Sequence, residues 1–132
     1  MLTTNRGAPR DRPSFLPTLG SDAVPLPFMD YLLREPIEAA VLHEPGVLVN
    51  VPAPARYAVH KLIVSRDRKV NPEKGLKDRL QAAQLIEILA QDDPFALRDA
   101  YAEARDRGET WRDLLEQAVS LLPDTARAAL EP

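Results

Sequence analysis

Basic side chains gather in the middle of the 132-residue sequence, where their types and spacing would suit a phosphate ligand. Residues 56–79 hold eight basic and three acidic residues, for a net charge of +5, whereas residues 92–132 hold five basic and ten acidic residues, for −5. Lysine offers a phosphate a point charge, arginine offers a planar fork, and a helix N-terminus adds unpaired amides. Charge alone leaves open that these are solvated helix faces, or faces that attract each other. The basic residues are Arg56, Lys61, Arg66, Arg68, Lys69, Lys74, Lys77 and Arg79.

Other kinds of chemical site find little support in the sequence. No cysteine is present, which excludes disulfides, thiolate metal ligands and a cysteine nucleophile. His43 and His60 have no partner at metal-ligand spacing, so a zinc site is not expected, and packing is the simpler role for His60. The serines lack the glycine frame of a hydrolase elbow, and no glycine-rich phosphate loop is present. The adjacent acids Asp92 and Asp93 are expected to cap a helix.

The composition is that of one globular domain. The chain is 45% hydrophobic and 28% charged, with a net charge of −3, which argues against disorder and against general binding to nucleic acid. No window reaches the roughly 18 apolar residues that a membrane span needs. The first 30 residues lack the continuous apolar stretch of a signal peptide, because prolines and arginines interrupt them. A cytoplasmic protein is therefore expected.

Prolines divide the chain into two parts that we expect to be built differently. Nine of the 13 prolines fall in the first 54 residues. Residues 1–27 predict an extended arm, because each proline removes a backbone donor and disfavours helix before it. A short helix is expected over residues 28–34, and the branched runs 37–42 and 47–51 around a Pro-Gly turn predict a β-hairpin. We predict these elements over residues 1–52 and a helical subdomain over residues 53–132.

Helix start signals recur in the second part. Pro54 suits a first helical position, Asn71 and Asp93 are cap residues followed by proline, and Thr110 with Asp113 resembles a capping box. The predicted helices span about 54–66, 72–90, 94–107 and 110–122, with one or two further turns over 124–130. The fold class is therefore α+β, with an extended arm, a short helix and a hairpin followed by a bundle of about four helices. The expected core includes Leu62, Leu80, Ile86, Leu89, Leu97, Tyr101, Trp111, Leu115 and Val119.

Several segments between residues 27 and 122 match a known family in their order and spacing. They are the run 27–33, the pair of hairpin strands with the prolines that follow, the run 57–64 around Lys61, and the run 74–78 ending in Lys77-Asp78. Together they resemble the C-terminal half of a bacterial nucleotidyltransferase-fold family, related at a distance to the abortive-infection toxin nucleotidyltransferases. The Lys61 helix followed by Lys77-Asp78 is the most specific part of the resemblance.

The resemblance implies transfer of a nucleoside monophosphate from a nucleoside triphosphate to an acceptor hydroxyl, with Mg²⁺ held by carboxylates. It implies that Lys61 and Lys77 touch phosphates and that Asp78 fixes Lys77 or a ligand hydroxyl. With Arg66 and Lys74, these residues are the expected phosphate-binding set. In the family, a Gly-Ser pair and the metal-binding carboxylates precede the region matched here. We therefore expect a chain without the metal site, inactive alone: a fragment, a truncated product or a remnant that depends on a partner.

An alternative function is that of a non-catalytic helical module for protein interaction or oligomerisation. The apolar residues of the arm and a two-stranded hairpin, marginal in water by itself, both favour docking on another surface. The expected partners are then a second copy of the chain or a complementary N-terminal half, besides a nucleotide. No membrane partner is expected, and the scarcity of aromatics beyond Tyr57 in the basic stretch argues against nucleic acid.

Overall fold

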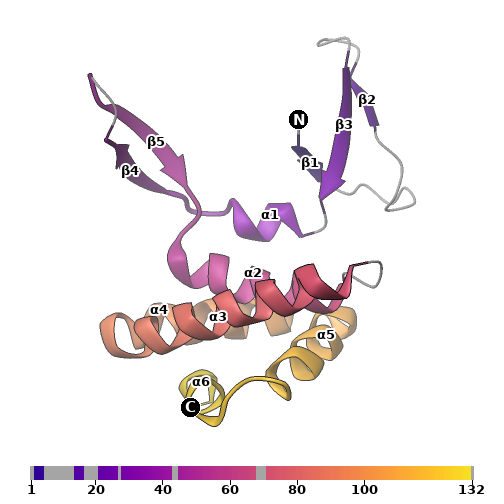
Figure 1. Ribbon diagram of the computed structural model, residues 1–132, viewed down its shortest axis with the longest axis vertical. Coiled ribbons are helices and arrows are strands. Elements are labelled where there is room, and N and C mark those ends of the chain that lie inside the picture. The colour runs from indigo at the N-terminus through magenta and orange to yellow at the C-terminus, as the bar shows by residue number, and fades with distance from the viewer. Residues whose placement is uncertain are drawn as a thin grey trace.

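The computed structural model describes residues 2–4, 14–16, 21–26, 28–42, 45–67 and 71–131 of the chain. Helices and strands combine there in an α+β fold, which confirms the predicted fold class. Figure 1 shows two small sheets on one side of the helical part, with helix α1 (Met29–Leu32) between them. None of the helices in these ranges is long and apolar enough to cross a membrane.

The segment expected as an extended arm contains three short strands that pair with each other. In the order β1-β3-β2, strand β3 (Ser21–Leu26) lies parallel to β1 (Leu2–Thr4) and antiparallel to β2 (Ser14–Leu16). Strand β2 pairs with the first half of β3 and β1 with the second half, so each half has one neighbour. Pro25 lies in the second half of β3, which pairs on one side only. Proline has no backbone N–H to donate, and a strand with an open side tolerates that loss. The β1–β3 pairing joins residues 22 positions apart and has no local signal, whereas β2 and β3 pair at short range; the sequence predicted neither pairing.

The predicted β-hairpin is confirmed. Strands β4 (Ile37–Val41) and β5 (Val47–Val51) pair antiparallel in one continuous register, and Gly46 in the turn has a φ of 90°. Such a φ favours glycine because a Cβ atom would clash. Every second residue of the two strands lies on one face, which is entirely aliphatic. Three of these side chains remain about half exposed, namely Ile37 (45%), Val41 (45%) and Val47 (51%).

In the ranges that the structure describes, five helices follow the hairpin, where the sequence predicts about four with a further turn or two. They are α2 (Pro54–Asp67), α3 (Pro72–Asp92), α4 (Pro94–Asp106), α5 (Glu109–Val119) and the short α6 (Asp124–Leu130). The caps predicted at Asn71 and Asp93 are confirmed, because their side chains accept hydrogen bonds from the backbone N–H of Lys74 (3.1 Å) and Ala96 (3.0 Å).

Helix α2 forms the centre of the core. It packs against α1, α3, α4 and α5, and its side chains Ala58, Val59, Leu62 and Ile63 are completely buried. A helix that is apolar on most sides is expected in such a position, because it has neighbours all round. Helix α5, at the edge, instead buries one face through Leu115, Ala118 and Val119.

Two details of the predicted helices are wrong. Leu80, expected in the core, is 56% exposed, because α3 faces α2 with the row that includes Ala82, Ile86 and Leu89. The predicted capping box at Thr110 does not form, since α5 begins at Glu109, which places Thr110 inside the helix, and the N-terminal cap residue is Gly108, which has no side chain to accept a hydrogen bond. Of the other core predictions, Tyr101 and Trp111 pack against the core while staying partly exposed, and the rest are buried.

Candidate functional site

Helices α2 and α3 approach each other unusually closely at Gly75. A Cβ atom added there would lie 2.8 Å from the backbone oxygen of Ser65, so only glycine allows this approach without a shift. One turn further along α3, Asp78 faces Lys61, which lies one turn before Ser65 on α2. The two helices therefore run antiparallel, and we call the line along which they meet the α2–α3 seam, marked by Gly75 and Ser65 at one end and by Lys61 and Asp78 further along.

Lys61 and Asp78 form the central contact of the seam. The Nζ atom of Lys61 donates a hydrogen bond of 2.7 Å to Oδ1 of Asp78, and the side chains are 19% and 8% exposed. The ring centroid of Tyr57, one turn earlier on α2, lies 5.4 Å from the same Nζ atom. Partial burial lowers the pKa of Lys61, but the hydrogen bond and charge of Asp78, with a smaller contribution from Tyr57, outweigh it and raise the pKa overall. Lys61 is thus held as a cation at the seam.

Two further predicted residues, Lys74 and Lys77, lie on the first two turns of α3 and are exposed. Lys74 is three residues before Lys77 and four before Asp78, so one turn of helix separates it from both. Of the predicted phosphate-binding set, the contact across the seam joins Lys61 and Asp78, whereas Lys77 is turned by about 100° from Asp78 around α3. Within the set, Asp78 bonds Lys61, whereas the sequence assigned it to Lys77 or to a ligand hydroxyl.

Arg66, the fifth predicted residue, faces a different neighbour. Its Nη2 atom donates a hydrogen bond of 3.2 Å to Oε1 of Gln117 on α5. Lys61, five positions earlier, faces α3 instead, since five residues correspond to a rotation of about 140° on a helix. The spacing in the sequence grouped the two residues, and the helix separates them.

The acidic groups of the described ranges do not gather into a larger cluster. No cluster of three or more histidine and carboxylate side chains that could hold a metal ion is found among these residues. Asp78, the carboxylate at the seam, is engaged by the ammonium group of Lys61.

A second charged cluster, which the sequence did not predict, joins α1 to the helices. Arg56 Nη2 lies 2.7 Å from Oε2 of Glu103 and 3.3 Å from Oε2 of Glu35, and Arg34 donates a 2.9 Å hydrogen bond to Glu103. The hydrogen bond from Arg56, together with the nearby arginine charges, lowers the pKa of Glu103 even though burial acts in the opposite direction. Arg56 belongs to the basic stretch and Glu103 to the acidic one, so part of the charge segregation serves attraction within the fold.

Tyr31 and Trp111 form the apolar side of this cluster. The Tyr31 hydroxyl donates a 2.8 Å hydrogen bond to the carbonyl of Ala100, and burial raises the pKa of this phenol. The guanidinium of Arg107 lies 5.2 Å and 5.1 Å from the ring centroids of Tyr31 and Trp111. The pair of rings meets edge to face at 5.4 Å. These contacts fasten α1 onto the helical part, which is a structural role.

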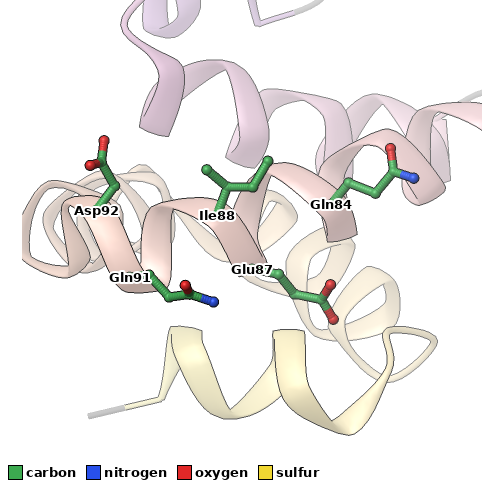
Figure 2. A pocket seen from close by; sticks show the side chains of 5 residues that line it. All are labelled: Gln84, Glu87, Ile88, Gln91 and Asp92. Carbon is green, nitrogen blue, oxygen red and sulfur yellow. The ribbon is translucent and has the colours of Figure 1, made fainter.

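Hollows elsewhere on the surface are less suited to an anion. One, of about 780 Å³, lies along the second half of α3, where Glu87 and Asp92 place carboxylates in the lining (Figure 2). Another, of about 430 Å³, lies between α4, α5 and α6, where Arg105 is 3.7 Å from Glu116. The first hollow is lined by Gln84, Glu87, Ile88, Gln91 and Asp92.

Comparison with known proteins gives one match. The model of a family described as nucleotidyltransferase matches residues 1–106, which is most of the chain and includes α1 to α4 and both sheets. The α2–α3 seam lies inside the matched region. No curated protein and no solved structure matches the chain.

Proposed function

Because the chain belongs to this nucleotidyltransferase family, we propose that its α2–α3 seam binds the triphosphate of a nucleoside triphosphate. The observation that carries the proposal is the position of Lys61, held as a cation by Asp78 of α3, the helix whose first two turns also carry the exposed Lys74 and Lys77. Lys61, Lys74 and Lys77 bring three ammonium groups to this pair of helices, and the carboxylate of Asp78 offsets one of them, so positive charge remains in excess for a triphosphate. The N-terminus of α3 adds its dipole at the same end of the helix.

Each residue of the seam has a distinct part in the proposal. Lys74 and Lys77, with exposed and flexible side chains, contact phosphate oxygens directly. Lys61 contributes charge from a fixed position, because Asp78 restricts its side chain and offsets the cost of its partial burial. Arg66 is not part of the proposed site, since its guanidinium is directed toward Gln117.

Calorimetric titration with ATP, GTP, CTP and UTP in the presence of Mg²⁺ tests the proposal. Lys77→Ala and Lys74→Ala should each weaken binding about 10-fold, the usual effect of losing a charged hydrogen bond. Arg98→Ala, which removes a positive charge from an exposed position of α4, is the matched control and should leave affinity unchanged. No binding of any of the four, or equal affinity of the lysine variants and the control, would contradict the proposal.

We further propose that the chain alone binds nucleotide without transferring it. This rests on the family's need for carboxylates around Mg²⁺, and on the engagement of Asp78 by Lys61 at the seam. Incubation with α-labelled nucleoside triphosphates and Mg²⁺ should release no pyrophosphate and label no acceptor. Pyrophosphate release that Lys77→Ala abolishes would show instead that the chain is an active transferase.

The hairpin favours a second candidate function, self-association. Apart from each other, neither β4 nor β5 packs extensively against another described element, and their aliphatic face stays half exposed. Chromatography with light scattering over a range of concentrations tests this function. A dimer that Val47→Lys dissociates is the expected result, and a monomer at all concentrations would rule out the second function.

A further inference from the structure

Tyr57 is an exposed aromatic residue on a helix that is otherwise largely buried. Its side chain is 37% exposed, whereas its neighbours Ala58 and Val59 are completely buried. Its ring lies 5.4 Å from the Nζ atom of Lys61, one turn further along α2. Tyr57 therefore presents an aromatic ring to solvent beside the lysine of the α2–α3 seam.

The order of groups along the seam follows from the antiparallel packing. Gly75 lies against Ser65 and Asp78 against Lys61, so the N-terminal turn of α3, with Lys74, lies toward the Ser65 end. Tyr57 lies at the opposite end, about 12 Å from Ser65 along the axis of α2, and about 6 Å from Lys61. Along the axis of the seam, the ring of Tyr57 therefore comes first, Lys61 with Asp78 comes next, and the turn of α3 that carries Lys74 comes last.

A nucleoside triphosphate presents its groups in the same order, with an aromatic base at one end and phosphates at the other. We propose that Tyr57 stacks on the base of the bound nucleotide while the lysines of the seam hold its phosphates. This inference rests on the proposed function and adds the position of the base. Stacking uses the π-face that every base has, so Tyr57 should provide affinity for all four nucleotides rather than select one.

Comparing ATP with inorganic tripolyphosphate separates stacking from any effect of Tyr57 on Lys61. Calorimetry with both ligands on Tyr57→Ala should show ATP binding weakened about 10-fold and tripolyphosphate binding unchanged. Tyr57→Trp and Tyr57→Phe, which keep a ring, should retain the affinity for ATP. Phe95→Ala, at an aromatic residue of α4 that is 77% exposed, is the matched control and should change neither affinity.

The outcomes distinguish stacking of Tyr57 on the base from an effect of Tyr57 through Lys61 and from no role at all. Equal weakening of ATP and tripolyphosphate by Tyr57→Ala would mean that Tyr57 acts only through Lys61, and unchanged binding of both would mean that it has no role; either result overturns the inference. Tripolyphosphate binding that depends on Lys77 would leave the proposed triphosphate site intact in both cases. If the unmodified chain binds neither ligand, the proposed function itself fails, and the inference fails with it.

Discussion

Lys61 and Asp78 are both largely shielded from water, which makes their ion pair costly to break from one side. Asp78→Ala leaves a partly buried ammonium group without its carboxylate, and we expect a loss of about 2 kcal/mol in the free energy of unfolding. Replacing both partners by apolar residues, as in Lys61→Met with Asp78→Leu, removes both charges and should cost less than Asp78→Ala alone. Urea denaturation of the three proteins measures both effects.

Asp99→Ala is the matched control for this comparison, since it removes an exposed carboxylate from α4. It should change stability by less than about 0.5 kcal/mol, as surface substitutions usually do. Equal stabilities of Asp78→Ala and Asp99→Ala would mean that the ion pair contributes nothing to the fold.

Glu103 gives the α1 cluster a dependence on pH. The hydrogen bond from Arg56 and the neighbouring arginine charges lower the pKa of Glu103 in the folded state below its ordinary value of 4.5. A lowered pKa stabilises the fold above the unfolded-state value, and this contribution is lost as the pH falls through the folded-state value. We therefore expect Glu103→Gln to be less stable than the unmodified chain at pH 7, with the difference shrinking below about pH 4.5.

Urea titrations at a series of pH values between 7 and 3 measure this difference. Subtracting the two stabilities at each pH removes the contributions of the other carboxylates, provided that they do not contact Glu103. A difference that stays constant down to pH 3 would assign the effect of the substitution to packing rather than to the charge of Glu103.

For single residues, the sequence shows which chemical groups are present but not which side chains meet in the fold. The lysine-rich stretch predicts phosphate chemistry, which stays a prediction, and the structure pairs one of its lysines, Lys61, with Asp78. The partner of Asp78 could not be predicted from the sequence. Lys77 is its neighbour in the chain, but successive side chains on a helix point about 100° apart, so the two do not face each other. Arg56 and Glu103 lie even further apart in sequence, and nothing near either residue indicates their contact.

At the scale of elements, Gly75 determines how closely α2 and α3 pack. Alanine normally favours a helix over glycine by about 1 kcal/mol, so a substitution judged by helix propensity alone would stabilise the chain. Here the added methyl group would meet the backbone oxygen of Ser65 at 2.8 Å. We expect Gly75→Ala to lower the free energy of unfolding by about 1–3 kcal/mol, as overpacking does, because the two helices must separate.

Gln84→Ala, at an exposed position of the same helix, provides the comparison. It carries no steric conflict and should leave stability unchanged or slightly increased, in accord with helix propensity. If Gly75→Ala matches this result under thermal or urea denaturation, the close approach of the helices is not needed. A weaker affinity for tripolyphosphate in Gly75→Ala would, in addition, connect the packing of the seam to its proposed ligand.

The elements were predicted best where local residues determine them. Asn71 and Asp93 start helices through hydrogen bonds to amides three residues away, so both caps could be recognised from the sequence. Leu80 was misplaced because α3 carries two apolar rows, and only the position of α2 decides which row is buried. The pairing of β1 with β3 joins segments about 20 residues apart, and no spacing within either strand specifies it.

For the whole molecule, the hairpin and the helical part differ in how they are stabilised. The hydrogen bonds of α2 are surrounded by other helices, whereas β4 and β5 bond mainly to each other. A two-stranded hairpin is marginal in water, so it opens locally at a much lower free energy than the core. Hydrogen exchange should therefore proceed at least tenfold faster for the amides of β4 and β5 than for those in the middle of α2.

Measuring this exchange at several protein concentrations also tests the second candidate function. If copies of the chain associate through the hairpin, the protection of β4 and β5 should rise with concentration, because binding adds to the stability of the bound form by mass action. The amides of α2 serve as the internal reference and should not change. Fast exchange of the hairpin at every concentration would leave nucleotide binding as the better supported function. Exchange as slow as that of α2 at the lowest concentration would contradict the exposure of the hairpin itself.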